Sequence, residues 1–440
     1  MTTVSENDVL TRVGPGTPMG NFLRQFWVPA CMSSELERGG APMRLMLLHE
    51  KLIAFRGGDG RVGIFDHRCP HRCASLFFGR NESDGLRCVY HGWKFDAEGN
   101  CLDMPNMPED QRFESKVKAF AYRTMERAGL VYVYMGAREA APPFPEIEAT
   151  MCPPEYAQTV LTQRDCNWLQ ALEGDIDTSH SGFLHTGGVD PNDLEPGQVS
   201  RFSITQKSPR ILTQEMPYGA MYTAERPADP GFKYHRMAHF IMPFWVAYPQ
   251  TAMTDNISAN AWVPIDDDHT MIFNIGDKRA SGVGRGMRRR DGTPVPGLAR
   301  PVEYLPRTTD WQGRWRPKMN ASNDFGLDRE AQRTWSFSGI IGIPLQDQMV
   351  QESMGPMIDR SRETLGGSDR MIVLTRRLLL QAALAYGESG KLPAILDDPG
   401  LCRDARGGDL ICPETVSWLD AYKDTIDRAK GRIQGQHAAE

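Results

Sequence analysis

Cys69-Pro70-His71 and Cys88-Val89-Tyr90-His91 are two short motifs that each combine one cysteine with one histidine. Thiolates are soft anionic ligands for ferric iron, and neutral imidazoles on a second iron raise the reduction potential of a cluster. Pro70 and Gly92 favour tight turns, so two loops can close over such a cluster from opposite sides. The pattern predicts a [2Fe-2S] cluster bound by Cys69, His71, Cys88 and His91.

A zinc site would use the same four side chains without a redox role. Zinc fingers place two cysteines in one motif and two histidines in the other, whereas both motifs here are mixed, which favours the cluster. Cys73 lies outside the mixed pattern and is predicted to be a buried thiol. Trp93 is expected to shield the cluster, to lie where an electron donor docks, or simply to pack.

The segment 167–185 is dense in potential metal ligands. His180 and His185 are five residues apart, and Gly182 permits a local break that lets both imidazoles converge. Two histidines and one carboxylate form a facial triad that binds Fe(II) and leaves positions open for dioxygen and substrate. We predict Asp347 as the carboxylate, with Glu352 as the alternative, because either acid would complete the triad.

Asp177 lies three residues before His180, where its carboxylate can accept the ring N–H that His180 does not use for iron. The alternatives are a helix cap or a surface ion pair. Five further residues either line the pocket or have a purely structural role: Asn167, Gln170, Glu173, His235 and His239.

Short β-type runs separated by turn dipeptides predict a small antiparallel β domain over residues 41–140. The runs are 44–48, 52–55, 62–65 and 130–134. Prolines continue neither a helix nor a central strand. Pro142, Pro143 and Pro145 therefore mark the domain boundary.

The second domain, residues 141–440, is predicted to mix helices with a sheet. A partly helical stretch is expected over 168–184, and long strands over 234–248 and 260–275. The irregular stretch 277–316 is typical of a functional loop or lid. A C-terminal helix is predicted to begin at Ser368 as N-cap and to stop at Gly387.

Composition excludes several classes of function. The net charge of −6 and the pI near 6.0 lack the positive field that nucleic-acid binding needs, and the basic run 285–290 is interpreted as a solvated loop. The polar, acidic N-terminus is unlike a secretion leader, and no apolar run has membrane-spanning length. Nine cysteines, an odd number at low density, favour a reducing cytoplasm.

Both metal motifs resemble those of the α subunit of Rieske ring-hydroxylating oxygenases, in particular the phthalate 4,5-dioxygenase-like group. The similarity rests on Arg12-Val13-Gly14-Pro15-Gly16-Thr17-Pro18-Met19-Gly20, Cys69-Pro70-His71-Arg72, Tyr90-His91-Gly92-Trp93-Lys94-Phe95, and Gln346-Asp347 leading into Gln351-Glu352-Ser353-Met354-Gly355-Pro356.

This resemblance implies an α+β protein in which an antiparallel β Rieske domain joins a helix-grip catalytic domain, with residues 1–40 packing on the latter. It implies a homotrimer, or a hexamer of stacked trimers, without nucleic-acid or membrane partners. Electrons would come from NAD(P)H through a separate flavin and iron-sulfur reductase. They would pass from His91 of one subunit through Asp177 of its neighbour to His180.

The resemblance further implies dioxygen and an aromatic acid as substrates, attacked by cis-dihydroxylation, by monohydroxylation or by O-demethylation. A buried substrate carboxylate needs a cation, and arginine suits it best. Arg210 and Arg236 are the candidates, with surface ion pairs as the alternative. A metal-stabilised electron carrier or binding protein is the hypothesis from another class, although a carrier has no use for an open metal position.

Overall fold

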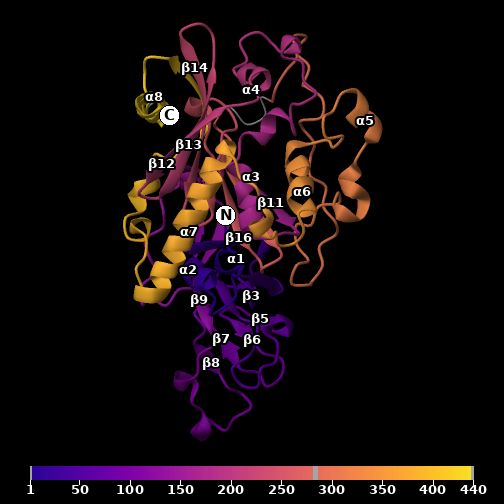
Figure 1. Ribbon diagram of the computed structural model, residues 1–440. Coiled ribbons are helices and arrows are strands. Elements are labelled where there is room, and N and C mark those ends of the chain that lie inside the picture. The colour runs from indigo at the N-terminus through magenta and orange to yellow at the C-terminus, as the bar shows by residue number, and fades with distance from the viewer. Residues whose placement is uncertain (1, 281–285, 438–440) are drawn as a thin grey trace.

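The structure is a computed structural model that describes residues 2–280 and 286–437. Arg285, the first residue of the predicted basic run, lies outside these residues. The chain forms a small β domain at one end and a larger sheet with helices at the other (Figure 1). This arrangement confirms the predicted α+β class of antiparallel sheets combined with helices. Within the described ranges, no helix is both long and apolar enough to cross a bilayer.

The small domain contains a six-stranded antiparallel sheet and a four-stranded one. The larger has the order β1 (Trp27–Met32), β10 (Leu130–Tyr134), β9 (Ala121–Arg127), β4 (Val62–Asp66), β3 (Glu50–Arg56) and β2 (Met43–Leu47). The smaller consists of β5 (Arg80–Asn81), β6 (Leu86–Arg87), β7 (Lys94–Phe95) and β8 (Cys101–Asp103). The two Cys/His motifs follow β4 and β6, so strands fix the start of each loop.

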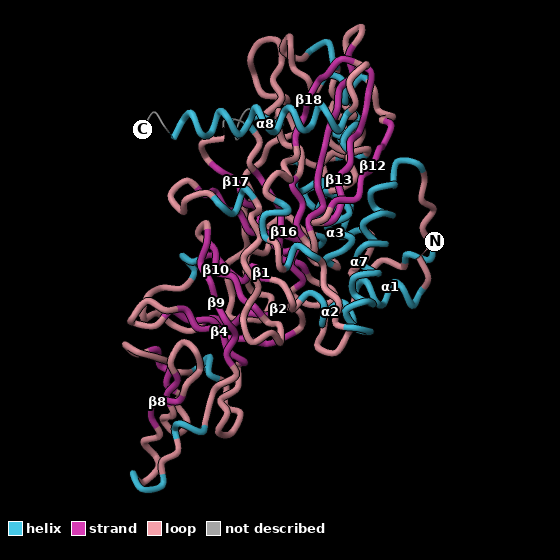
Figure 2. The backbone as a smooth tube through the Cα atoms, turned by 90° about the vertical axis from the view of Figure 1, so that its left-hand side faces the viewer, coloured by secondary structure: helices cyan, strands magenta, loops and turns pink. Residues whose placement is uncertain are grey.

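Strand β1 crosses the boundary predicted at residue 40. Trp27 to Met32 pair with β10, so this part of the N-terminal segment belongs to the sheet of the small domain. Helices α1 (Val4–Thr11) and α2 (Pro18–Leu23) instead contact the long helix α7 (Arg370–Ser389) of the large domain. The N-terminal segment therefore joins the two domains (Figure 2).

The large sheet has eight antiparallel strands. Its order is β11 (Ala157–Arg164), β17 (Thr270–Asp277), β16 (Ser258–Pro264), β15 (Trp245–Ala247), β14 (Phe232–Ile241), β13 (Gly219–Pro227) and β12 (Arg210–Met216), and β18 (Gly408–Pro413) pairs with β14. The packed helices are α3 (Trp168–Asp175), α4 (Arg201–Thr205), α5 (Arg329–Thr334), α6 (Ile343–Ser353), α7 and α8 (Trp418–His437). Helix α3 lies on β16, and α7 lies on β12 and β13.

Two predicted strands are hairpins instead. The run 234–248 is broken at Met242-Pro243 into β14 and β15, because proline cannot donate to a strand ladder. The run 260–275 is broken at the acidic stretch 266–268 into β16 and β17, where Ile265 N donates to His269 O at 2.9 Å. Charged residues in a row favour a solvated turn over a buried strand.

Helix α7, which corresponds to the predicted C-terminal helix, differs from that prediction at both ends. It begins at Arg370, not after Ser368, and continues through Gly387 to Ser389. Gly390 ends it in the left-handed conformation (φ 71°) that favours glycine. Gly387 is therefore a tolerated interior glycine.

Candidate metal centres

The first Cys/His loop is a tight turn closed by two backbone hydrogen bonds. Cys69 N donates to Ala74 O at 2.8 Å, and Cys73 N donates to Cys69 O at 2.9 Å. Cys73 is in the left-handed conformation (φ 59°) and its side chain is exposed. The prediction of a buried thiol was therefore wrong: Cys73 occupies the corner of the turn, where its side chain has to point outward.

The second loop repeats this backbone pattern. Cys88 N donates to Trp93 O at 2.8 Å, and Gly92 N donates to Cys88 O at 3.0 Å. Gly92, the fifth residue of its loop as Cys73 is of the other, also has a positive φ (79°). The sequence thus builds two similar cradles, each of which begins at a buried cysteine.

The four predicted cluster ligands face one another across these loops. The ring centroids of His71 and His91 are 4.4 Å apart. Trp93 stacks on His71, with 4.3 Å between the ring centroids and 7° between the ring planes. A hydrogen bond from Cys69 lowers the pKa of Cys88 to about 6, and backbone N–H groups of the loop act in the same direction. His71 Nδ1 is buried without a hydrogen-bond partner. An orphaned imidazole nitrogen beside two buried thiols fits a [2Fe-2S] cluster.

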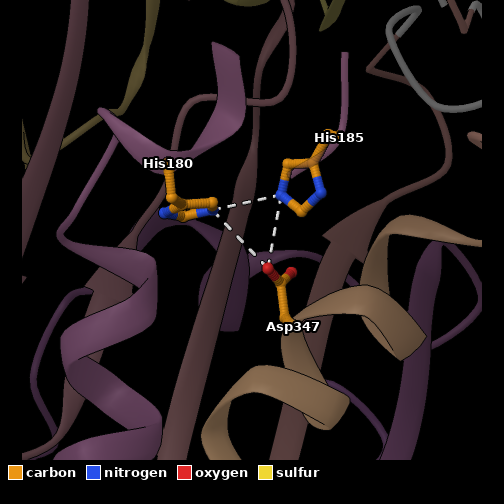
Figure 3. Close-up of side chains that lie close together, drawn as sticks. All are labelled: His180, His185 and Asp347. Atoms are coloured by element: carbon orange, nitrogen blue, oxygen red, sulfur yellow. Dashed lines mark hydrogen bonds and ion pairs between the residues drawn. The ribbon is translucent and has the colours of Figure 1, made fainter. Parts of the chain in front are cut away.

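The second centre joins two segments that are far apart in the sequence. After α3, a 3-10 turn (His180–Gly182) carries His180, and the chain then turns back to His185; Asp347 projects from the first half of α6 (Figure 3). The Nε2 atoms of the two histidines are 3.1 Å apart, and Asp347 Oδ1 is 3.5 Å from that of His180 and 3.3 Å from that of His185.

These distances fit a metal ion. Three ligand atoms at right angles about a metal, each about 2.1 Å away, are about 3 Å apart. Burial raises the pKa of Asp347, but the two histidines outweigh this and hold the pKa below its usual value, so the carboxylate stays ionised. Within the described parts of the chain this is the one group of three such side chains with ligand atoms so close together. Two nitrogens and one oxygen on one side of a metal leave the opposite side open, as Fe(II) oxygen chemistry requires.

Asp177 lies beside the first of these histidines, as predicted. Its Oδ2 is 3.4 Å from His180 Nδ1, and its Oδ1 accepts bonds from Ser179 N and Oγ at 2.8 and 2.7 Å. Burial raises the pKa of Asp177, but the hydrogen bonds from His180 and Ser179 lower it below the usual value. Its side chain keeps 22% of its surface exposed, so the carboxylate has an outward side.

Gln346 plays the corresponding part for His185, and sequence reasoning missed it. Its Oε1 is 2.8 Å from His185 Nδ1, and its Nε2 donates to Ile340 O at 2.7 Å. The bond to the Ile340 carbonyl fixes which end of the amide faces the histidine. Its place immediately before Asp347 was the available signal.

Glu352, the alternative carboxylate, is not part of this group. It lies five residues beyond Asp347 on α6 and accepts bonds from Asp165 N at 3.1 Å and from Gln348 Nε2 at 2.8 Å. Burial raises its pKa. It ties α6 to the segment before α3.

Three polar residues, the N-cap of α3 and two within the helix, had open interpretations; all three are buried and tie segments together. Asn167 caps α3 and donates to Thr11 O and Asp267 O. Gln170 donates to Gln351 O and Gly355 O. Glu173 pairs with Arg360 and Arg376 at 3.2 and 2.6 Å.

The two candidate arginines lie in different surroundings. Arg236, on β14, donates to Thr178 Oγ1 at 3.2 Å and pairs with Asp409 at 3.0 Å, next to the loop that carries Asp177. Its side chain is 22% exposed. Arg210 is exposed at the start of the edge strand β12. Among the described residues, no hydrogen bond or ion pair joins Arg210 to the metal-ligand group.

His235 and His239 do not join either centre. They lie on β14 rather than on a helix, both fully buried. His235 Nδ1 is 3.0 Å from Thr223 Oγ1, and His239 Nδ1 is 2.7 Å from Tyr218 Oη. Burial lowers the pKa of His239 to about 3, which leaves it a neutral core residue.

Comparisons with known proteins agree with both centres. Residues 26–121 match the Rieske [2Fe-2S] domain, and residues 133–423 match the LigXa C-terminal domain like family. The chain is 44% identical to a 3-chlorobenzoate-3,4-dioxygenase oxygenase subunit from Comamonas testosteroni over 97% of this chain and 99% of the relative. It is 37% identical to a phthalate 4,5-dioxygenase oxygenase subunit from Pseudomonas putida over 88% of each.

Solved structures share the fold. Dicamba monooxygenase bound to dicamba has a TM-score of 0.55 at 16% identity, over 83% of this chain and 99% of that one. NdmA of Pseudomonas putida CBB5 has a TM-score of 0.54 at 20% identity, over 91% and 100%. The chain therefore belongs to the Rieske non-haem iron oxygenases, as an oxygenase (α) subunit that carries a [2Fe-2S] cluster and a mononuclear iron.

Proposed function

We propose that this oxygenase subunit adds both atoms of dioxygen to the ring of an aromatic carboxylate, as a cis-diol. The observation that carries the proposal is the open-sided group of His180, His185 and Asp347 beside Arg236. Two relatives that match most of the chain are by name dioxygenases of 3-chlorobenzoate and phthalate, both aromatic acids.

In this proposal Cys69, His71, Cys88 and His91 hold the cluster, and His180, His185 and Asp347 hold the iron. When bound, the ferrous centre activates dioxygen with electrons that the cluster stores. Asp177 and Gln346 orient the two histidines, because each hydrogen-bonds the Nδ1 atom of its partner, His180 or His185. Both imidazoles thereby keep Nε2 for the metal.

Asp177 also has a second task in the proposal. Its outward side would contact His91 of a neighbouring copy, so that one carboxylate orients a histidine of each centre. A homotrimer, single or stacked, supplies that neighbour. The chain would work in the cytoplasm with a separate reductase that uses NAD(P)H.

Arg236 is proposed to hold the substrate carboxylate. It donates a hydrogen bond to Thr178, the residue that follows Asp177 in the sequence. Part of the Arg236 side chain is accessible. Asp409 balances its charge in the absence of substrate, which lowers the cost of burying the cation. Arg210, exposed on the edge strand, stays a prediction from the sequence.

A second reaction is favoured by one relative. A 5,5'-dehydrodivanillate O-demethylase oxygenase subunit is 32% identical over 91% of this chain, so oxidation of a methoxy carbon is the alternative outcome. The electron-carrier hypothesis is abandoned, because the chain belongs to a family of oxygenases.

Product analysis tests the proposal. The iron-loaded protein, a surrogate reductase and NADH are incubated with benzoates, phthalates, phenoxybenzoates and methoxybenzoates. We expect a cis-dihydrodiol, or the catechol formed from it, containing two atoms from ¹⁸O₂. A phenol with one labelled oxygen, or formaldehyde, would replace the dioxygenase assignment with a monooxygenase one.

A further inference from the structure

Asp175, the last residue of α3, is a carboxyl that neither metal centre uses. Its Oδ2 accepts two hydrogen bonds from β16, from Asn260 Nδ2 at 2.6 Å and from Trp262 Nε1 at 2.8 Å. Asn260 and Trp262 are two residues apart on one strand, so both side chains point to the sheet face that α3 covers. The carboxyl is therefore anchored to the sheet by one oxygen.

The network behind this anchor runs across the sheet. Asn274 on β17 is the register partner of Asn260, and its Nδ2 donates to Asn260 Oδ1 and to Tyr248 Oη, each at 2.7 Å. Asn260 uses its oxygen to accept and its nitrogen to donate onward. This polarity leaves Asp175 as the acceptor at the end of the network.

The other oxygen of Asp175 is open. Among the described residues, Oδ1 makes no hydrogen bond, yet it is not a sealed atom, because the side chain keeps accessible surface. Burial raises the pKa of Asp175 to about 6, and the charge of Asp347 acts in the same direction. Helix α3 also packs on α6, the helix that carries Asp347, and Gln351 Nε2 of α6 donates to Ala171 O of α3 at 3.2 Å. Asp175 is thus partly accessible and lies at the end of a helix that contacts the helix of the proposed iron ligand.

We infer that Asp175 faces the substrate beside the metal-ligand group and selects the ring substituent, accepting a hydrogen bond from a hydroxyl or amino group and disfavouring a second carboxylate. The inference rests on the proposed function and names the substrate class within it: aromatic monocarboxylates with an uncharged, hydrogen-bond-donating substituent. Arg236 would hold the one carboxylate of such a substrate.

The physical reason is charge balance. A substrate hydroxyl that donates to a carboxylate makes a charge-assisted hydrogen bond, which is stronger than a neutral one. A second substrate carboxylate would instead lie beside Asp175 and Asp347, and like charges in a poorly solvated site repel strongly. Benzoate without a substituent would fall between these two cases.

The test uses Asp175→Asn, which keeps one oxygen for Asn260 and Trp262 and puts an NH₂ where Oδ1 was. Dissociation constants of 3-hydroxybenzoate, benzoate and isophthalate are measured by calorimetry on the iron-loaded holoprotein without oxygen. The control is Asp193→Asn, which changes an exposed carboxylate outside these contacts. Iron content and cluster absorbance are measured for each protein.

For the wild type and the control we expect 3-hydroxybenzoate to bind at least about tenfold more tightly than isophthalate. In Asp175→Asn this ratio should fall by about tenfold or more. An unchanged ratio in a variant that keeps its iron and cluster would overturn the inference alone. A variant that fails to fold leaves the wild-type order as the test, and tighter binding of isophthalate would refute it. If none of the acids binds the wild type, the proposed function fails as well.

Discussion

The two metal centres of this chain are built in opposite ways. The proposed cluster site comes from two short loops with the same backbone hydrogen bonds, and each would supply one thiol and one imidazole. The proposed iron site would take two ligands from residues 180–185 and a third from α6, more than 160 residues later. The first site needs only that two loops meet, whereas the second needs the whole catalytic domain to fold.

The side chains that hold the histidines also differ between the two centres. His71 of the first loop is covered by the ring of Trp93 from the second loop, so the two motifs support each other directly. His180 is oriented by a carboxylate and His185 by a neutral amide, which itself depends on the carbonyl of Ile340. Errors in distant packing should therefore damage the iron site first and leave the cluster intact.

The largest expected effect separates the centres outright. Asp347→Ala should lose the mononuclear iron and all product formation, because two histidines alone hold Fe(II) weakly. The cluster, bound by other loops, should keep its visible absorbance and its sulfide. Metal analysis with absorbance spectra checks this, and loss of the cluster together with the iron would show that the sites are not independent.

Asp177→Asn should break the connection between the centres rather than either centre. Both metals should remain bound, while product formation falls by about 100-fold or more, because the amide removes the charge that holds the His180 N–H. Single-turnover kinetics after chemical reduction of the cluster measures the effect. Coupled turnover near the wild-type rate would refute the bridging role.

Gln346→Leu should weaken the iron site by an intermediate amount. Loss of the bond to His185 is expected to reduce iron affinity by about 10- to 100-fold, the usual range for groups that orient a metal-bound histidine. Competition with a chelator gives the affinity. Gln348→Leu, on the same helix but bonded to Glu352, is the matched control and should retain iron.

The smallest effects should distinguish the two cluster loops. Cys73→Gly relieves a left-handed cysteine and should stabilise the domain by up to about 1 kcal/mol without changing the cluster. Gly92→Ala should destabilise it, since φ is 79° and a Cβ atom would lie 2.6 Å from Pro105. Thermal loss of cluster absorbance ranks the two; equal behaviour would contradict the loop comparison.

The sequence predicted the two centres to different depths. The sequence alone indicates the cluster chemistry, because its four predicted ligands lie in two short motifs: Cys69, His71, Cys88 and His91. Asp347 required a choice against Glu352, five residues away, which only the packing of α6 on α3 resolves. Gln346 and Asp175 were missed because their partners lie on segments that come together only in the folded chain.

Secondary structure shows the same limit. The strand 130–134 was predicted with its observed ends, because its apolar run is short and bounded by turns. The long runs 234–248 and 260–275 were each predicted as one strand, although Pro243 in the first and the acidic residues 266–268 in the second mark a hairpin. Periodicity gives the face of a strand, and the turn residues give its length.

Metal and sulfide analysis of the wild type before and after mild chelation tests the central claim most directly. Two independent centres predict about three irons and two sulfides per chain, with about one iron removed by the chelator while cluster absorbance persists. Iron that leaves as a single pool together with the sulfide, or a colourless zinc protein, would contradict the account.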